Sequence, residues 1–341
     1  MIKKIIQFIL SLLLGYYFVN RQVERMQGQE QFGLYRESLA AVWHAAPAFW
    51  PYFIGSAISF ALALLVRGHR WQMMLGRKNL VWLSFRSIAI GYAVHLFLSR
   101  VGELVRVANQ RRYSGAPIGH LMATLFIDRL TDIAIFTLLI ITSYYLGAET
   151  LKQHFPQIIG LLPYMAGTVL VGLIGMMVLV FTSGWIQHHL ARALWIPEGI
   201  RGLLGSFVGR MAEGLVHCRA PLRVLHIVLS SFVIWFFYFT TFYLAARPFL
   251  GEKGFSFIQS QFVFTCSTLG MIIPTPGGLG SYHEFTGRGY EIMCGLSPAD
   301  AFALTTFTFL YVIWGLNLAC GLIAYLVQLM GFCGTSKAES P

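Results

Sequence analysis

The stretch MIIPTPGGLGSYHE, residues 271–284, decides how the rest of the chain is interpreted. It lies between an apolar run that ends at Ile273 and a long apolar segment that begins near residue 301. No helix is expected to continue through it, because proline lacks a backbone donor and glycine permits positive φ. Its helix-breaking residues are Pro274, Pro276, Gly277, Gly278 and Gly280. Irregular backbone at membrane depth is tolerated only inside protein or beside a cavity, so the stretch is predicted to form part of a site.

The composition places the chain in the membrane. Of its 341 residues, 56% are hydrophobic and 11% are charged, and the mean hydropathy is +0.65. This balance lies far outside that of soluble domains and predicts an all-α polytopic membrane protein. The net charge of +11 comes from basic residues scattered between apolar segments, so nucleic acid is not an expected partner. The histidines and cysteines show no ligand spacing, and no metal or cofactor is expected.

Six apolar segments are predicted to cross the bilayer. They cover approximately residues 5–19, 50–66, 121–146, 161–181, 224–245 and 301–330. Residues 1–49 are interpreted as a membrane anchor helix and a polar loop, 50–333 as the transmembrane domain, and 334–341 as a short polar tail. Apolar residues at spacings of four between 203 and 215 predict an amphipathic surface helix.

Two further apolar runs, residues 87–98 and 262–273, are too short to cross. A helix of this length measures about 18 Å, against a hydrocarbon core of about 30 Å. Both are therefore interpreted as parts of re-entrant hairpins, over residues 87–112 and 262–290. Turn signals at 115–117 and 295–298 lie 180 residues apart, so the two halves are predicted to form an inverted repeat of the kind found in transporters.

The distribution of basic residues predicts that the N-terminus is cytoplasmic. With both short runs drawn as hairpins, thirteen basic residues lie on the cytoplasmic side and six on the other. The cytoplasmic set includes the five basic residues between Arg67 and Arg86. The orientation fits a multi-pass protein of the inner membrane.

Six charged residues lie in or beside the hairpins and the segment after the first: Glu103, Arg106, Asp128, Arg129, Asp132 and Glu284. A charge at the bilayer centre costs about 2.5–3.5 kcal/mol, so such residues need partners or a function. Asp128 and Asp132 are four residues apart and share one helix face. In one interpretation, arginines bind an anionic headgroup while the acids orient them or carry protons. In the other, the charges pair only to fix the first hairpin against the next helix.

Three motifs follow one another along the chain: SRVGELVR at residues 99–106, DRLTD at 128–132, and PTPGGLG at 274–280, followed by Glu284. In this order and spacing, over about residues 50–330, they resemble the lysylphosphatidylglycerol synthase transmembrane-region family, also called flippase-like domain proteins. The family usually has a proline just before Arg100 and a glutamate where Asp128 stands. Without that proline, the break in the first hairpin is expected to rest on Gly102.

The resemblance implies a membrane domain that, in bifunctional aminoacyl-phosphatidylglycerol synthases, moves the modified lipid across the bilayer. No soluble aminoacyltransferase domain and no enzyme activity are expected, because the chain ends about ten residues after its last apolar segment. The implied function is binding and translocation of an anionic phospholipid or a polyprenyl-lipid. The predicted substrate-binding residues are Arg100, Gly102, Glu103, Arg106, Asp128, Arg129, Asp132, Pro274, Pro276, Gly277, Gly278, Gly280 and Glu284.

Two alternatives belong to other functional classes. An integral-membrane enzyme acting on a lipid-linked sugar or phosphate would need a nucleophile or a metal cluster, and the sequence contains neither HExxH nor a paired-aspartate metal motif. A non-transporting partner could hold a lipid-modifying enzyme at the membrane through the basic segment 192–219. Copurification of such an enzyme, with no lipid retained, would favour this second alternative.

Overall fold

The computed structural model describes most of the chain and shows an all-α protein. The described residues are 13, 16–18, 20, 29–76, 81–98, 101–146, 156–192, 197–218, 220–250, 255–273 and 275–330. Within these ranges the secondary structure is helical and contains no strand, as expected for an all-α membrane protein. The segment expected at 5–19 falls largely outside the described residues, and the tail at 334–341 falls entirely outside them.

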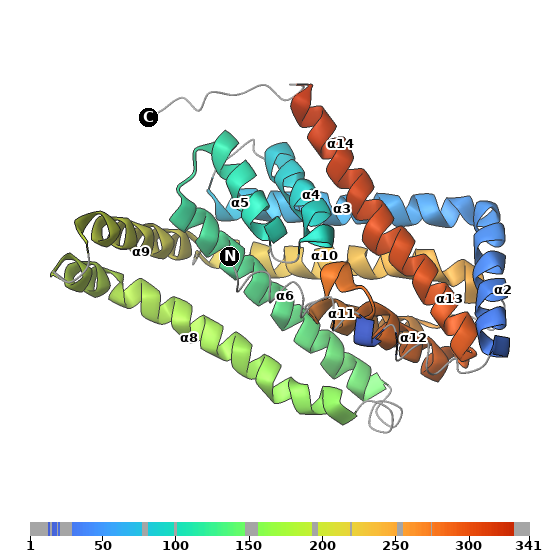
Figure 1. Cartoon of the computed structure of the whole chain (residues 1–341). Coiled ribbons are helices and arrows are strands. Elements are labelled where there is room, and N and C mark those ends of the chain that lie inside the picture. The colour runs from blue at the N-terminus through green and yellow to red at the C-terminus, as the bar shows by residue number, and fades with distance from the viewer. Residues whose placement is uncertain are drawn as a thin grey trace.

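The described helices are shown in Figure 1. Those of the first half are α2 (Gln29–Ala45), α3 (Trp50–Met74), α4 (Val81–Phe97), α5 (Val101–Ser114), α6 (Ile118–Leu146) and α8 (Pro156–Arg192). Those of the second half are α9 (Glu198–Cys218), α10 (Pro221–Ala246), α11 (Phe257–Ile272), α12 (Ser281–Cys294), α13 (Pro298–Thr308) and α14 (Asn317–Leu329). A π-helical segment, η4 (Phe309–Leu316), joins α13 to α14 without a break.

Three helical segments in the described part of the chain have the length and apolar composition of membrane spans. They are Gly33–Met74, Pro221–Leu250 and Pro298–Leu329. The first shows that α2 and α3 run on through a short 3-10 segment, so the helix does not end at residue 66 as expected from the sequence. It continues for two more turns and carries Arg67 and Arg70 into the protein.

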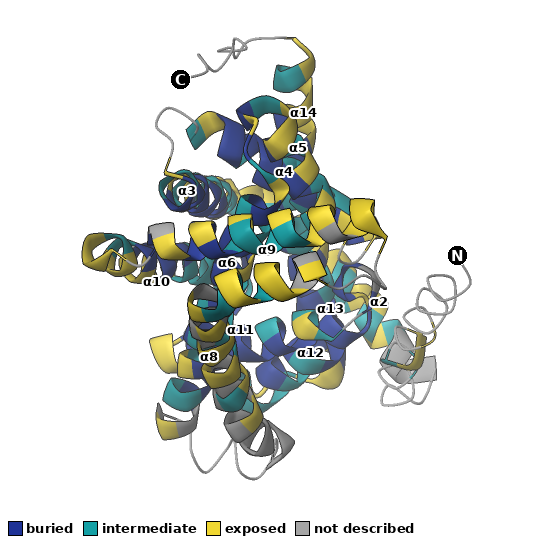
Figure 2. Ribbon diagram, turned by 90° about the vertical axis from the view of Figure 1, so that its left-hand side faces the viewer, coloured by how far each residue is buried: buried dark blue, intermediate teal, exposed yellow. Residues whose placement is uncertain are grey.

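Two pairs of short helices, α4 with α5 and α11 with α12, pack closely within each pair. In both views of the structure they lie on opposite sides of α10 (Figures 1 and 2). At 1.5 Å per residue, the 17 residues of α4 and the 16 of α11 measure about 24–26 Å, less than the hydrocarbon core of about 30 Å.

The first pair is held together by two glycines whose backbones meet. A Cβ atom on Gly102 would lie 2.1 Å from the carbonyl oxygen of Gly91, and one on Gly91 would lie 2.7 Å from the carbonyl oxygen of Gly102. Gly102 is the second residue of α5, so it does not break the hairpin as expected from the sequence. The break comes earlier, between the end of α4 at Phe97 and the start of α5 at Val101. The role of Gly102 is to let the two helices touch.

A Gly102→Ala substitution is therefore expected to lower the free energy of unfolding by about 1–3 kcal/mol, the usual cost of overpacking a close contact. The measurement is thermal unfolding of the detergent-purified protein. Gly175→Ala is the matched control, because a Cβ on Gly175 meets nothing within 4 Å in α8. Equal unfolding temperatures for the two variants would show that the α4–α5 contact does not need glycine.

The loop between α11 and α12 has the backbone that its sequence predicts. Gly277, Gly278 and Gly280 have φ angles of 57°, 80° and 81°. Ser281 supplies hydrogen bonds inside the turn: its hydroxyl donates to the carbonyl oxygen of Gly270 at 2.7 Å and lies 2.7 Å from the hydroxyl of Thr275. The buried loop thus satisfies polar groups with its own side chains, as it must away from water.

The two turn signals 180 residues apart have the same structure. Gly115 and Gly295 both adopt left-handed backbone, with φ of 66° and 64°. The following helices, α6 and α13, begin at residues 118 and 298, which preserves the offset. Ser297 caps α13 by accepting from the backbone N–H of Asp300, and Pro298 occupies the first turn. The correspondence that the sequence predicted between these positions is thus present in the backbone.

The remaining helices lie outside this centre. α2 packs on α13 through ring contacts between Tyr35 and Phe302 and between Trp43 and Phe307. The region 20–49, expected to be an exposed loop or a surface helix, thus contains a helix that packs on the second half of the chain. α8 and α9 pack on each other and on α6, and Figure 2 shows exposed residues along much of both. Leu215 at the end of the predicted amphipathic segment joins the core.

Candidate functional site

A network of buried ion pairs connects α3 to α6. Arg67 and Arg70, one turn apart on α3, face Asp128 and Asp132, one turn apart on α6. The guanidinium of Arg67 donates to both oxygens of Asp132 at 2.5 and 2.6 Å and lies 3.9 Å from Asp128. Arg70 donates to Asp128 and, at 2.5 Å, to the hydroxyl of Ser231 on α10. Charges so deeply buried are stable only when paired in this way.

The first hairpin joins the same network through α5. Arg106 donates from Nη1 to Asp128 at 2.9 Å. Oε1 of Glu103 lies 2.7 Å from Nε of Arg129. Nη1 of the same arginine lies 3.4 Å from Oδ2 of Asp132. The exposed fraction falls along the network, from 37% for Arg129 and 33% for Glu103 to 13% for Asp132 and 1% for Arg106. One side of the network is therefore accessible and the other is enclosed.

The network leaves hydrogen-bond donors without a partner. Nε and Nη2 of Arg106 are buried and have no acceptor, although the guanidinium also lies over the ring of Trp71, 4.0 Å from its centroid. In the part of the chain that the structure describes, four arginines and three carboxylates make up the network, so it carries one net positive charge. An unpaired buried guanidinium donor is costly unless an acceptor arrives from elsewhere.

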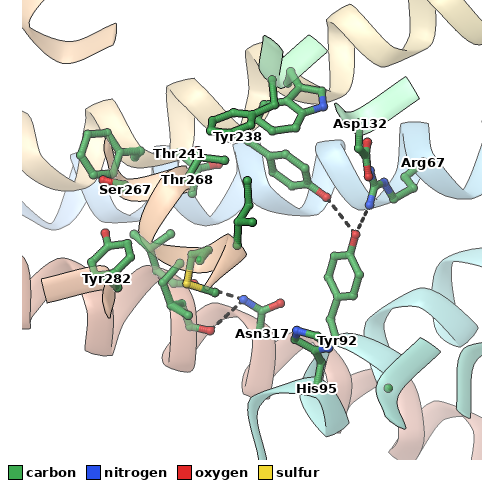
Figure 3. Close-up of a pocket in the computed structure, with 18 of the residues that line it drawn as sticks. Arg67, Tyr92, His95, Asp132, Tyr238, Thr241, Ser267, Thr268, Tyr282 and Asn317 are labelled. Atoms are coloured by element: carbon green, nitrogen blue, oxygen red, sulfur yellow. Dashed lines mark hydrogen bonds and ion pairs between the residues drawn. The ribbon is translucent and has the colours of Figure 1, made fainter. Parts of the chain in front are cut away.

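The network borders a cavity of about 620 Å³. Arg67, Glu103, Arg106, Arg129 and Asp132 line its charged end. Figure 3 shows Tyr92 and Tyr238 converging on Arg67 there, with their hydroxyls 3.5 Å apart. The rest of the wall is mostly apolar and aromatic and comes from both halves of the chain; it includes Phe60, Phe136, Trp235, Phe242, Phe264 and Leu269. Nε1 of Trp235 and Nε of Arg67 are further buried donors without a partner in the cavity wall.

The structure brings together the charged residues predicted in the first half. Gly102, Glu103, Arg106, Arg129 and Asp132 line the cavity, and Asp128 stands behind them with no exposed surface. The pairs Arg106–Asp128 and Glu103–Arg129 link α5 to α6, as the interpretation of the charges as mutual pairing expected. Arg100 and Pro274 lie outside the described residues.

The predicted residues of the second hairpin lie elsewhere. Gly277, Gly278, Gly280 and Glu284 are buried but do not line this cavity, and Pro276 belongs to the short 3-10 turn of the loop. A Cβ on Gly277 would come within 2.8 Å of the carbonyl oxygen of Leu96 and 3.3 Å of the Trp314 ring. Glu284 lies 3.7 Å from Arg288 on its own helix. This loop is therefore the contact between the two hairpins and the π-helical segment.

The sequence analysis missed most of the residues that line the cavity, among them the polar residues Arg67, Tyr92 and Tyr238, and it missed Arg70 of the network. The sequence contained a signal for the arginines. Residues three apart, such as Arg67 and Arg70, and residues four apart, such as Asp128 and Asp132, each lie on one face of a helix, so two such helices can face each other. The arginines were instead counted as cytoplasmic charges beyond the end of a span. Both are buried, as is Arg86.

Within the described ranges, no group of three or more His, Cys, Asp or Glu side chains is placed to hold a metal ion. The carboxylates of the network are each engaged with arginines instead.

Comparison with known protein families identifies the chain. A family model described as Lysylphosphatidylglycerol synthase TM region matches residues 5–320. The chain belongs to this family. The lysylphosphatidylglycerol synthase TM-region match includes both hairpins, the ion network and the cavity, and it describes a membrane protein related to lipid handling. Comparisons with curated proteins and with solved structures gave no match.

Proposed function

We propose that this member of the family binds an anionic lipid in the cavity and moves it across the membrane. The observation that carries the proposal is the pair of unpartnered guanidinium donors of Arg106 at the charged end of a largely apolar cavity. Arginine donors suit a phosphate oxygen, and a phosphodiester would neutralise the single excess positive charge of the network. The cargo is an anionic phospholipid or a polyprenyl-linked phosphate.

The arrangement gives each part of such a lipid a place. The partly exposed pair of Glu103 and Arg129 forms the accessible side, where a headgroup would first meet charge. Arg106 lies deeper and would take the phosphate, while Asp128 holds its guanidinium in position from behind. The aromatic wall between the two halves would contact the acyl or prenyl chains. The proposal assigns binding and release to these residues and no catalytic step.

The proposal includes an inverted repeat with two re-entrant hairpins and about six full crossings. In this repeat α3 corresponds to α10, α4 to α11, and α6 to α13 and α14. Three helix contacts support it: α3 packs on its counterpart α10, α4 of the first half packs on α14 of the second, and α11 of the second half packs on α6 of the first. The helices α4 and α11, with 17 and 16 residues, lie at or just below the shortest length that usually spans a bilayer, which favours re-entrant hairpins. Two hairpins that meet at a shared loop contact, with the cavity beside them, give the protein the parts for exposing one site alternately to two sides.

The proposed location is the inner membrane, with the N-terminus in the cytoplasm. The buried residues Arg67, Arg70 and Arg86 do not count toward the orientation, and removing them leaves ten basic residues on the cytoplasmic side against six on the other. The remaining difference still favours this orientation.

The test is translocation of a fluorescent phosphatidylglycerol in proteoliposomes, followed by dithionite quenching. An Ile133→Trp variant places a large ring in the cavity wall of α6 and is expected to reduce the rate at least tenfold. Leu138→Trp is the control, because Leu138 is 41% exposed on the outside of the same helix, and it is expected to retain the wild-type rate. Wild-type translocation by Ile133→Trp would contradict a route through this cavity.

A further inference from the structure

The helical segment Pro298–Leu329 contains a stretch that is not α-helical. Its middle part, η4 (Phe309–Leu316), is a π-helix between α13 and α14. π-Helices are rare, and those inserted in α-helices are found frequently at functional sites. The corresponding part of the first half, 180 residues earlier, lies inside α6, which is α-helical throughout. The π-helix therefore belongs to the second half alone and departs from the repeat.

The π-helical segment lies between the cavity and the ends of the two hairpins. Ile313 lines the cavity, as does Asn317 directly after the segment. Trp314 packs edge-on against Phe97 at the end of α4, with ring centroids 5.3 Å apart. Its ring also lies 3.3 Å from the position that a Cβ on Gly277 would occupy in the loop of the second hairpin. A change in this segment would therefore act on the cavity and on both hairpins.

The side chain of Asn317 satisfies a carbonyl group that the π-helix leaves open. In an α-helix the backbone N–H of Asn317 would donate to the carbonyl oxygen of Ile313, four residues earlier. Here that N–H donates to the carbonyl oxygen of Trp314 instead. The side-chain amide of Asn317 donates to the carbonyl oxygens of Ile313 at 2.8 Å and of Val312 at 3.4 Å, and Figure 3 shows it in the cavity wall. Because an unpaired carbonyl is costly at membrane depth, this amide stabilises the π-helical form.

A ligand in the cavity would compete for the same amide. An amide nitrogen has two N–H donors, and Asn317 uses them within the helix. An acceptor oxygen that takes these donors leaves the carbonyl of Ile313 without a partner, unless the backbone rewinds to an α-helix and supplies one. Each residue of an α-helix turns the chain by about 100°, so rewinding would rotate Trp314 away from Phe97 and Gly277.

We propose that Asn317 couples occupation of the cavity to the contact between the two hairpins. Without a bound lipid, Asn317 holds the π-helix and Trp314 holds the hairpin ends together. A lipid whose phosphate or ester oxygen accepts from Asn317 releases the π-helix, and the hairpin ends separate. This inference rests on the proposed function for the lipid, and it adds how binding opens the protein. It applies to glycerophospholipids of any headgroup, because phosphate and ester oxygens are common to them all.

The experiment measures hydrogen–deuterium exchange by mass spectrometry, on the detergent-purified protein with and without saturating phosphatidylglycerol. The backbone amides of residues 94–98 and 275–280, at the hairpin ends, are expected to exchange about tenfold faster with lipid, because the ends are then no longer packed together. Native mass spectrometry of the same samples counts the bound lipid. Unchanged or slower exchange at both ends, with lipid bound, would overturn the inference and leave the proposed function standing. Absence of bound lipid would remove the proposed function and this inference with it.

An Asn317→Leu variant assigns the effect to this amide. Leucine is close to asparagine in size but donates no hydrogen bond, so the π-helix loses its support, and both hairpin ends are expected to exchange at the fast rate without lipid. Gln328→Leu is the matched control, because it removes an amide from the same helix, α14, at a position outside the cavity wall, and it is expected to exchange like the wild type.

Two results with the variants would overturn the role of Asn317. One is slow exchange in Asn317→Leu with the response to lipid retained. The other is fast exchange in both variants, which would assign the effect to general loosening of α14. The comparison of the wild type with and without lipid needs no variant, so it decides the inference even if Asn317→Leu fails to fold.

Discussion

An Asp128→Asn variant is expected to lose most of its folded population on purification. Asp128 has no exposed surface and faces three arginines: Arg67, Arg70 and Arg106. Asparagine keeps the size and some hydrogen-bonding capacity of the side chain but removes its charge, which leaves three guanidinium groups close together in the protein interior. Breaking a buried pair typically costs about 3–5 kcal/mol, a large part of the usual stability of about 5–15 kcal/mol.

The measurement for Asp128→Asn is the yield of monodisperse protein and its apparent unfolding temperature. Glu213→Gln is the matched control, because it removes the charge of an exposed carboxylate on α9 and is expected to change stability by less than about 0.5 kcal/mol. If Asp128→Asn unfolded at the wild-type temperature, the ion network would not be what holds α3, α5 and α6 together.

An Arg106→Gln variant is expected to fold but to bind phosphatidylglycerol at least 100-fold more weakly. Asp128 keeps Arg67 and Arg70 as partners, so no carboxylate is left alone in the interior. The variant loses the two donors of Arg106 that have no acceptor in the protein. Hydrogen bonds to charged groups are worth about 1.5–3 kcal/mol each, and two of them account for a loss of this size.

The measurement for Arg106→Gln is a titration with phosphatidylglycerol followed by native mass spectrometry. Arg112→Gln is the control, because it removes an exposed guanidinium from the same helix, α5, and is expected to bind like the wild type. Wild-type affinity in Arg106→Gln would assign Arg106 a structural role, as would unfolding as severe as that of Asp128→Asn.

Local rules in the sequence predicted much of the architecture. Pro, Gly and Ser at 274–281 and 295–298 dictate backbone that few other residues adopt, and the structure has positive φ at Gly277, Gly278, Gly280 and Gly295. Each of the two short apolar runs was predicted to form a hairpin with the segment that follows it. In the structure α4 packs on α5, and α11 packs on α12. These features depend on neighbouring residues, which is why sequence alone reveals them.

The features that escaped prediction depend on tertiary packing. Arg67 was placed beyond a membrane span because a charged residue normally ends one, but here a facing aspartate on α6 allows the helix to continue. Gly102 was expected to break a helix, whereas its role is a contact with Gly91 on the neighbouring helix. Neither partner can be identified from local sequence.

In the candidate site, too, some features were predicted from local sequence and others depend on tertiary packing. The motif at 99–106 and the acids at 128–132 were predicted to meet, and their charges required partners at membrane depth. The loop at 275–280 was also predicted to line the site because its backbone is irregular. Irregular backbone needs only to be buried in protein, and this loop satisfies that condition against Leu96 and Trp314, beside the other hairpin.

The central claim is that the cavity beside Arg106 holds the phosphate of a lipid. Electron cryo-microscopy of the wild-type protein in nanodiscs containing phosphatidylglycerol tests it most directly. The account predicts density for a headgroup phosphate within hydrogen-bonding distance of Nη2 of Arg106, with acyl chains along Phe136, Trp235 and Phe264. A closed arginine network with lipid only on the outer surface of the helices would contradict it.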